Sequence, residues 1–135
     1  MYGVDGKKLS SWYKYFLSCY QGWEQLHHAS EYVLFKENLG ERLSMDETSL
    51  SQGELYTIIT NKSAHGGKGS LVAMIKGTKS EDVIYYLNHL PRTKRLKVKE
   101  ITIDLSPSMR LIADQSEKRL HLVVLSCDFC QCNAL

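Results

Sequence analysis

The order of short apolar runs between residues 42 and 105 constrains the fold more than any other feature of the sequence. Three runs rich in β-branched and apolar residues, 42–50, 54–61 and 70–76, follow one another with only turn-forming segments between them. An amphipathic helical pattern comes next, and a fourth run follows it at 100–105. Consecutive strands joined by tight turns pair antiparallel, whereas a strand reached through a helix can lie parallel to an earlier one. We therefore predict a mixed α/β sheet whose fourth strand lies parallel beside the first.

Two helices complete this order. The first starts at Ser80, the predicted N-cap, with two acids in its first turn, and Pro91 forbids its continuation. The second opens at Ser106-Pro107, because proline suits the first helical position. The complete order is β-β-β-α-β-α, which is the order of the ribonuclease H-like core.

The first 41 residues show a different period. Apolar and aromatic residues recur three and four positions apart over 10–20 and over 22–34, which predicts two amphipathic helices broken at Gly22. The aromatic side chains could stack on bases, but their helical spacing favours packing against the sheet. We therefore predict a helical preface over residues 1–41, ahead of the sheet domain.

Composition narrows the class of protein. The chain has 135 residues, of which 43% are hydrophobic and 24% charged, an ordinary mixture for one globular domain. Its formal net charge of +2 is too small to indicate nucleic-acid binding from the total alone. The sequence contains no run of apolar residues long enough to cross a membrane. We expect a soluble, cytoplasmic protein without a membrane partner.

Two aspartates lie where the predicted sheet would bring them together. Asp46 falls in the first predicted strand and Asp104 near the end of the fourth, so parallel pairing would give them neighbouring positions. Carboxylates held close together repel each other, and a divalent cation such as Mg²⁺ can relieve that repulsion. An aspartate in an apolar strand can also mark a strand end that is hydrogen-bonded to nearby backbone amides. Spacing alone favours this second interpretation.

Longer segments around both aspartates resemble a known family. The runs LSMDETSLSQGELYT at 43–57 and ITIDLSPSM at 101–109 resemble the two acidic strands of bacterial insertion-sequence transposases with a DDE domain. Asn61-Lys62 and the segment 71–78 also match. The resemblance covers roughly residues 4–116, and it is specific because several long runs match in the same order.

The resemblance implies a catalytic role for both aspartates. Asp46 and Asp104 would be the first and second catalytic acids and would bind Mg²⁺ or Mn²⁺. The implied function is metal-dependent cleavage and transfer of DNA strands in DNA transposition, with the transposon ends as the DNA partner. Glu47 is not counted as a ligand, because adjacent residues of a strand point to opposite faces.

A basic stretch follows the predicted helix. Its cations alternate with uncharged residues and could neutralise DNA phosphates, and a solvated loop is an equally good interpretation. The candidate DNA-binding residues are Arg92, Lys94, Arg95, Lys97 and Lys99.

The segment 117–135 departs from the family pattern. Family members continue into a further strand and a helix that bears a catalytic glutamate, whereas this segment ends in a cysteine-rich run typical of a shifted reading frame. Neither Asp114 nor Asp128 is a suitable replacement for that glutamate. We therefore expect a partial transposase domain over 42–116, incomplete at its C-terminus and without the third acid.

Two functions follow from this pattern. The chain would be a transposase fragment, inactive as a recombinase because the third acid is missing. The alternative is a non-catalytic fragment that binds DNA, or associates with itself or with an intact transposase, and thereby interferes with transposition. The cysteine spacing Cys-x-x-Cys-x-Cys at 127–132 could hold a metal, but no partner pair stands upstream, and reduced thiols are the better interpretation.

Overall fold

The computed structural model describes residues 3, 5–103 and 111–112. By its contacts the chain divides after Glu31 into two compact units, and each unit is described by itself. The predicted segment 117–135, its cysteines and Asp104 lie outside the described residues.

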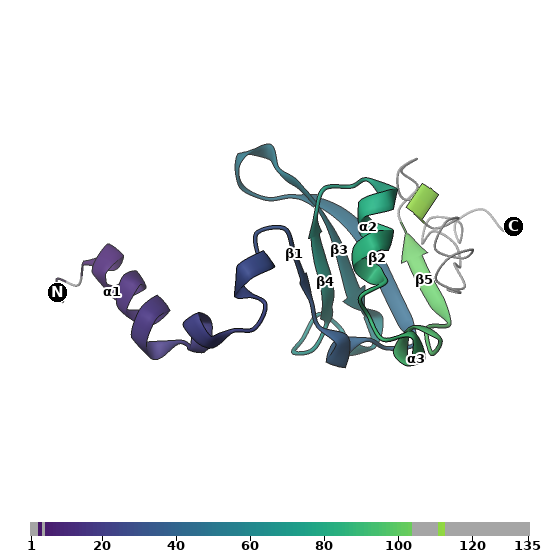
Figure 1. Cartoon of the computed structure of the whole chain (residues 1–135), viewed down its shortest axis with the longest axis horizontal. Coiled ribbons are helices and arrows are strands. Elements are labelled where there is room, and N and C mark those ends of the chain that lie inside the picture. The colour runs from purple at the N-terminus through teal and green to yellow at the C-terminus, as the bar shows by residue number, and fades with distance from the viewer. Residues whose placement is uncertain (1–2, 4, 104–110, 113–135) are drawn as a thin grey trace, which may run out of the picture. The chain divides into compact units, whose positions relative to one another are not determined.

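A mixed sheet forms the second unit. Within the described residues it has five strands in the order β1-β4-β3-β2-β5 (Figure 1). Strands β2, β3 and β4 form an antiparallel meander, β1 pairs antiparallel with β4, and β5 lies parallel beside β2. This confirms the predicted meander and the parallel pairing of the strand that follows the helix. The strands are β1 Tyr32–Leu34, β2 Arg42–Ser49, β3 Leu55–Asn61, β4 Leu71–Lys76 and β5 Glu100–Ile103.

Helix α2 (Ser80–Leu87) covers one face of the sheet (Figure 1). Alternate residues of the strands point toward it, because successive side chains of a strand face opposite sides. Leu43 and Met45 of β2 are buried on this side, whereas Arg42 and Asp46 alternate with them and are exposed. We call the side that carries Arg42 and Asp46 the open face. The core cluster consists of Leu43, Met45, Ile59, Val72, Ala73, Ile75, Val83, Leu87, Leu90, Val98, Ile101 and Ile112.

The tight turn between β2 and β3 forms as predicted. It is a 3-10 turn over Ser51–Gly53, in which Gln52 and Gly53 have φ values of 63° and 75°. Glycine suits the second of these positions because it adopts positive φ without steric cost. The amide of Leu50 donates to the carbonyl of Glu54 at 3.1 Å and closes the hairpin.

The helical predictions around α2 need correction. Ser80 is the first helical residue and not the N-cap, and Lys79, which occupies the cap position, makes no side-chain capping bond. The basic connection contains a short helix, α3 (Arg92–Arg95), which begins directly after Pro91. The predicted helix from Ser106 is described only at residues 111–112, which are helical.

The prediction of two helices ahead of the sheet is wrong for the second one. Residues 22–34 contain a 3-10 turn at Leu26–His28 and then strand β1. Val33 is buried, and the amide of Phe35 donates to the carbonyl of Val72 at 2.7 Å. Pairing with the edge of β4 thus outweighs the helical spacing of the apolar residues, as tertiary contacts often do.

The first unit contains the other predicted helix in altered form. Helix α1 (Gly6–Trp12) is capped by Asp5, whose carboxylate accepts from the amide of Lys7 at 3.0 Å, and a π-helical turn continues it over Tyr13–Leu17. None of the described residues up to Glu31 is buried. Packing of these aromatic side chains against the sheet stays a prediction. Across the part of the chain that the structure describes, no helix has the length and apolar character to cross a membrane.

Candidate metal and DNA site

Asp46 lies in β2 on the open face, opposite Ile58 of β3. Its Oδ1 atom accepts a hydrogen bond from the backbone amide of Glu47 at 2.8 Å. An aspartate bonded to a neighbouring amide is what the non-catalytic interpretation of the sequence expects. The bond also fixes the direction of the carboxylate while using only one of its two oxygens. Asp46 can therefore serve as an oriented, exposed oxygen ligand.

Strand β5, which pairs with β2, directly precedes the second aspartate, Asp104, in the sequence. In the parallel ladder Ser44 pairs with Thr102 and Met45 pairs with Ile103. Met45 and Ile103 are the residues directly before Asp46 and Asp104 in the sequence. The described ladder therefore ends one residue before the two aspartates on both strands.

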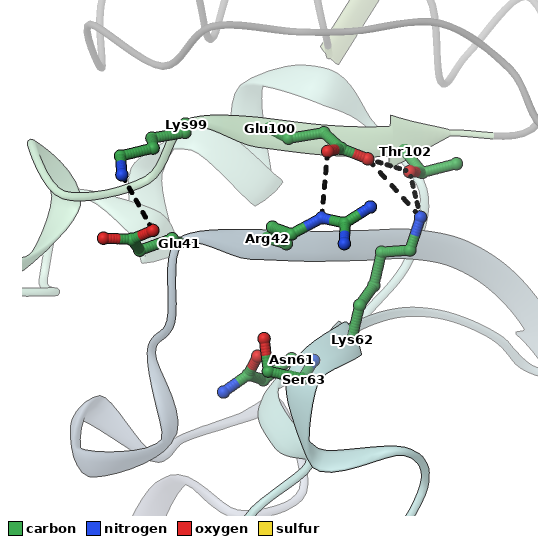
Figure 2. Close-up of polar contacts among 8 residues, drawn as sticks. All are labelled: Glu41, Arg42, Asn61, Lys62, Ser63, Lys99, Glu100 and Thr102. Atoms are coloured by element: carbon green, nitrogen blue, oxygen red, sulfur yellow. Dashed lines mark hydrogen bonds and ion pairs between the residues drawn. The ribbon is translucent and has the colours of Figure 1, made fainter.

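A polar cluster occupies the open face beside this ladder (Figure 2). Glu100 accepts from Arg42 Nε at 3.1 Å through Oε2, and its Oε1 lies 3.5 Å from Lys62 Nζ. Lys62 Nζ also donates to Thr102 Oγ1 at 2.9 Å. We call Arg42, Lys62, Glu100 and Thr102 the Glu100 cluster. It joins β2, β5 and the turn after β3 on the side of the sheet that carries Asp46.

The charges of the Glu100 cluster do not balance. Hydrogen bonding from Arg42 is the main cause that holds the pKa of Glu100 below its usual 4.5, and the charges of Arg42 and Lys62 act in the same direction. Two cations therefore share one carboxylate. The cluster as a whole carries one net positive charge.

The backbone beneath Lys62 is held by the side chain of Asn61. Its Oδ1 accepts from the amide of Ser63 at 3.0 Å and caps the 3-10 turn Lys62–Ala64. Its Nδ2 donates to the carbonyl of Asn38 at 3.0 Å. Asn61 packs so closely on Gly40 that a Cβ added there would lie 2.7 Å from Nδ2 and Oδ1. Only glycine leaves room for this arrangement.

Sequence reasoning did not identify the members of the Glu100 cluster as site residues. In the sequence, Lys62 belongs only to a segment that resembles the family. A period-two signal was available, since Arg42 and Asp46 alternate with apolar residues and Glu100 stands at the matching position of the fourth strand. The contact between Lys62 and Thr102 had no such signal, because it joins residues that lie 40 positions apart.

Two cations of the predicted DNA-binding stretch are bound to acceptors of the protein itself. Lys94 Nζ donates to the carbonyl of Lys36 at 3.0 Å. Arg95 donates to the carbonyl of Leu90 through Nε and to Asn88 Oδ1 through Nη1, both at 3.0 Å. Burial lowers the pKa of the Arg95 guanidinium. These two side chains help to fix α3 to its surroundings.

The other three cations lie nearer to solvent. Lys99 forms an ion pair with Glu41 at 2.9 Å between two largely exposed side chains, and Arg92 and Lys97 are exposed. The stretch ends where β5 begins, level with the first residue of β2. Asp46 lies four residues further along β2, roughly 13 Å away at about 3.3 Å per residue. DNA binding by these five residues stays a prediction.

The described residues hold no group of three or more His, Cys, Asp or Glu side chains close enough to bind a metal ion. Asp46 by itself offers the hard carboxylate oxygen that Mg²⁺ and Mn²⁺ prefer. Glu100 is not available as a further ligand without loss of its bonds to Arg42 and Lys62.

Fold and site together define a class of protein. A mixed α/β sheet that carries an oriented carboxylate beside a cationic cluster has the components needed to handle a phosphate group. Comparison with protein families makes the class specific: a DDE transposase family of the ISL3 type, described as a transposase, matches residues 43–124. Since the match covers more than half of the chain, the chain belongs to this transposase family. A comparison with individually curated proteins finds no match.

The matched range agrees with the resemblance found in the sequence and refines it. It includes Asp46, Lys62 and Asp104. It begins at Leu43, later than the start of the resemblance, and it continues over residues 117–124, where the sequence itself showed no family pattern.

Proposed function

We propose that this chain takes part in metal-dependent cleavage and transfer of DNA strands in transposition, with Asp46 and Asp104 as ligands of Mg²⁺ or Mn²⁺. One observation carries the proposal. The β2–β5 ladder runs parallel and in register up to the pair Met45–Ile103. One further step of the same ladder would bring the two carboxylates to neighbouring positions on the open face.

Each group would then have a distinct task. Bound divalent ions supply the activation of an attacking water or 3′-hydroxyl and the stabilisation of the leaving oxygen. Asp46 would hold an ion from β2, and its bond to the Glu47 amide would keep the carboxylate aimed before the ion arrives. Asp104, the residue that follows β5 in the sequence, would hold the same ion. A pre-oriented ligand binds without losing further side-chain freedom.

We also propose that the sheet is a ribonuclease H-like core and that the partial domain spans residues 42–116. The support is the antiparallel meander β2-β3-β4, the passage through α2, and the return of β5 parallel to β2. Acting on transposon ends, the protein would work in the cytoplasm, alone or with further copies. That the chain is inactive as a recombinase stays a prediction. A non-catalytic DNA-binding or self-associating fragment is the alternative.

Calorimetric titration of the folded chain with Mg²⁺ and Mn²⁺ tests this proposal. The variants are Asp46→Asn and Asp104→Asn, and Asp82→Asn is the matched control, because it removes an exposed acid from α2. We expect saturable binding that is lost in both site variants and kept in the control. Absence of binding in the wild-type chain, with a native circular dichroism spectrum, would contradict the proposal.

Incubation with supercoiled plasmid and Mn²⁺ then separates the two functions. Nicking that depends on Asp46 supports the catalytic function and contradicts the predicted inactivity. Metal and DNA binding without nicking supports the non-catalytic alternative.

A further inference from the structure

We propose that Lys62 is a phosphate-binding residue of this site, whose ammonium group holds a DNA phosphate on the face of the sheet that carries Asp46. The inference rests on the proposed function, because it adds a substrate contact to the same face of the sheet.

The position of the ammonium group is the first support. Lys62 extends from the turn after β3, across β2, to Thr102 on β5 (Figure 2). Thr102 pairs with Ser44, and both precede an aspartate by two residues. Residues two apart on a strand share a face and lie about 6.6 Å apart. Thr102, which the ammonium contacts, is therefore one strand across and one same-face step along from Asp46, a Cα separation of roughly 8 Å.

The surplus charge is the second support. Glu100 is bonded more closely to Arg42, at 3.1 Å, than to Lys62, at 3.5 Å. Within the cluster Arg42 alone balances Glu100, which leaves the positive charge of Lys62 available to a phosphate. The Lys62 side chain is 29% exposed, so water and salt screen this charge less than that of a fully exposed lysine.

The third support is the way in which the ammonium is oriented. An ammonium group has three N–H donors. Among the described residues two acceptors lie within reach of Nζ, Glu100 Oε1 and Thr102 Oγ1, so one donor remains for a ligand. Thr102 is 4% exposed, and its hydroxyl is neutral. It therefore fixes the direction of the ammonium without cancelling its charge, which suits a group that must bind an anion.

Fluorescence anisotropy with a labelled DNA duplex tests the inference, with Ca²⁺ in the buffer to allow binding without cleavage. The variants are Lys62→Met and Lys62→Arg. Lys68→Met is the matched control, since it removes an exposed cation from the same β3–β4 hairpin. We expect Lys62→Met to weaken binding about 10-fold and to reduce the slope of log K against log salt by about one. Lys62→Arg should recover most of the affinity, and Lys68→Met should stay close to wild type.

A purely structural tie between β3 and β5 would give a different result. Lys62→Met would then lower the midpoint of thermal unfolding but leave DNA affinity and salt slope unchanged, which would overturn the inference. Thr102→Val covers the case in which Lys62→Met does not fold, because it keeps both the charge and the buried volume. Unchanged DNA affinity in Thr102→Val would also overturn it.

The result can be read separately from the test of the proposed function. Equal DNA binding by wild type and Lys62→Met, together with metal binding that depends on Asp46, would contradict only the inference about Lys62. A folded wild-type chain that binds neither metal nor DNA would contradict both.

Discussion

Replacing Gly40 by alanine tests how the turn beneath Lys62 is held. The new Cβ would lie 2.7–2.8 Å from three atoms of the Asn61 side chain, which is closer than Cβ atoms approach other heavy atoms in proteins. The side chain can move away only by giving up its bonds to Ser63 and Asn38. The expected loss of folding stability is that of two hydrogen bonds, at about 1 kcal/mol each. The lower entropy of unfolded alanine offsets about 0.5 kcal/mol of it, so we expect a net loss on the order of 1.5 kcal/mol.

Urea unfolding followed by circular dichroism measures this loss as a lower midpoint at an unchanged slope. A double-mutant cycle supplies the control. In an Asn61→Ala background the clash is absent, and Gly40→Ala should become neutral or slightly stabilising. If Gly40→Ala is equally destabilising in both backgrounds, the close approach to Asn61 is not its cause. If it is neutral in the wild-type background, Asn61 does not hold the turn.

Three further results are expected. Arg42 lowers the pKa of Glu100, so the ionised carboxylate stabilises the folded state above pH 4.5 and loses this effect as pH falls through its lowered pKa. The difference in unfolding free energy between wild type and Glu100→Gln should therefore be present at neutral pH and disappear in acid. Ile59→Ala should lower the free energy of unfolding in urea by about 3 kcal/mol, since Ile59 is 1% exposed. A similar loss in Leu50→Ala, at a residue that is 46% exposed, would show that burial is not the cause. Lys99→Ala breaks an exposed ion pair and should change stability by less than about 0.5 kcal/mol; a larger loss would mean that this pair is needed to start β5.

The strands of the meander could be predicted because their signals are local. Alternating and β-branched residues followed by Ser51–Gly53 specify a strand and a tight turn within a few positions. Strand β1 had no such signal, since its residues also fit a helical spacing. Its extended form depends on hydrogen bonds to β4, about forty residues away. The failure of the second predicted helix therefore reflects a long-range pairing that no local pattern records.

The candidate site likewise combines residues that the sequence predicts with residues that only the folded structure brings together. The sequence predicts Asp46 and Asp104 as candidate ligands, because the aspartates lie inside long runs that resemble a family, and the range of the family match spans both positions. It did not identify the Glu100 cluster. Lys62 meets Glu100 and Thr102 only after the end of β3 and the start of β5 have been brought to either side of β2.

The sequence by itself determined the order of strands β2 to β5, the crossover through α2 and the family to which the chain belongs. These follow from local periodicity, turn residues and matching runs. The tertiary structure alone decided that β1 joins the sheet, that Asn61 packs on Gly40, and that Lys62 reaches the face that carries Asp46. Such contacts depend on the register between strands and on the reach of long side chains, which are fixed only when the sheet has assembled.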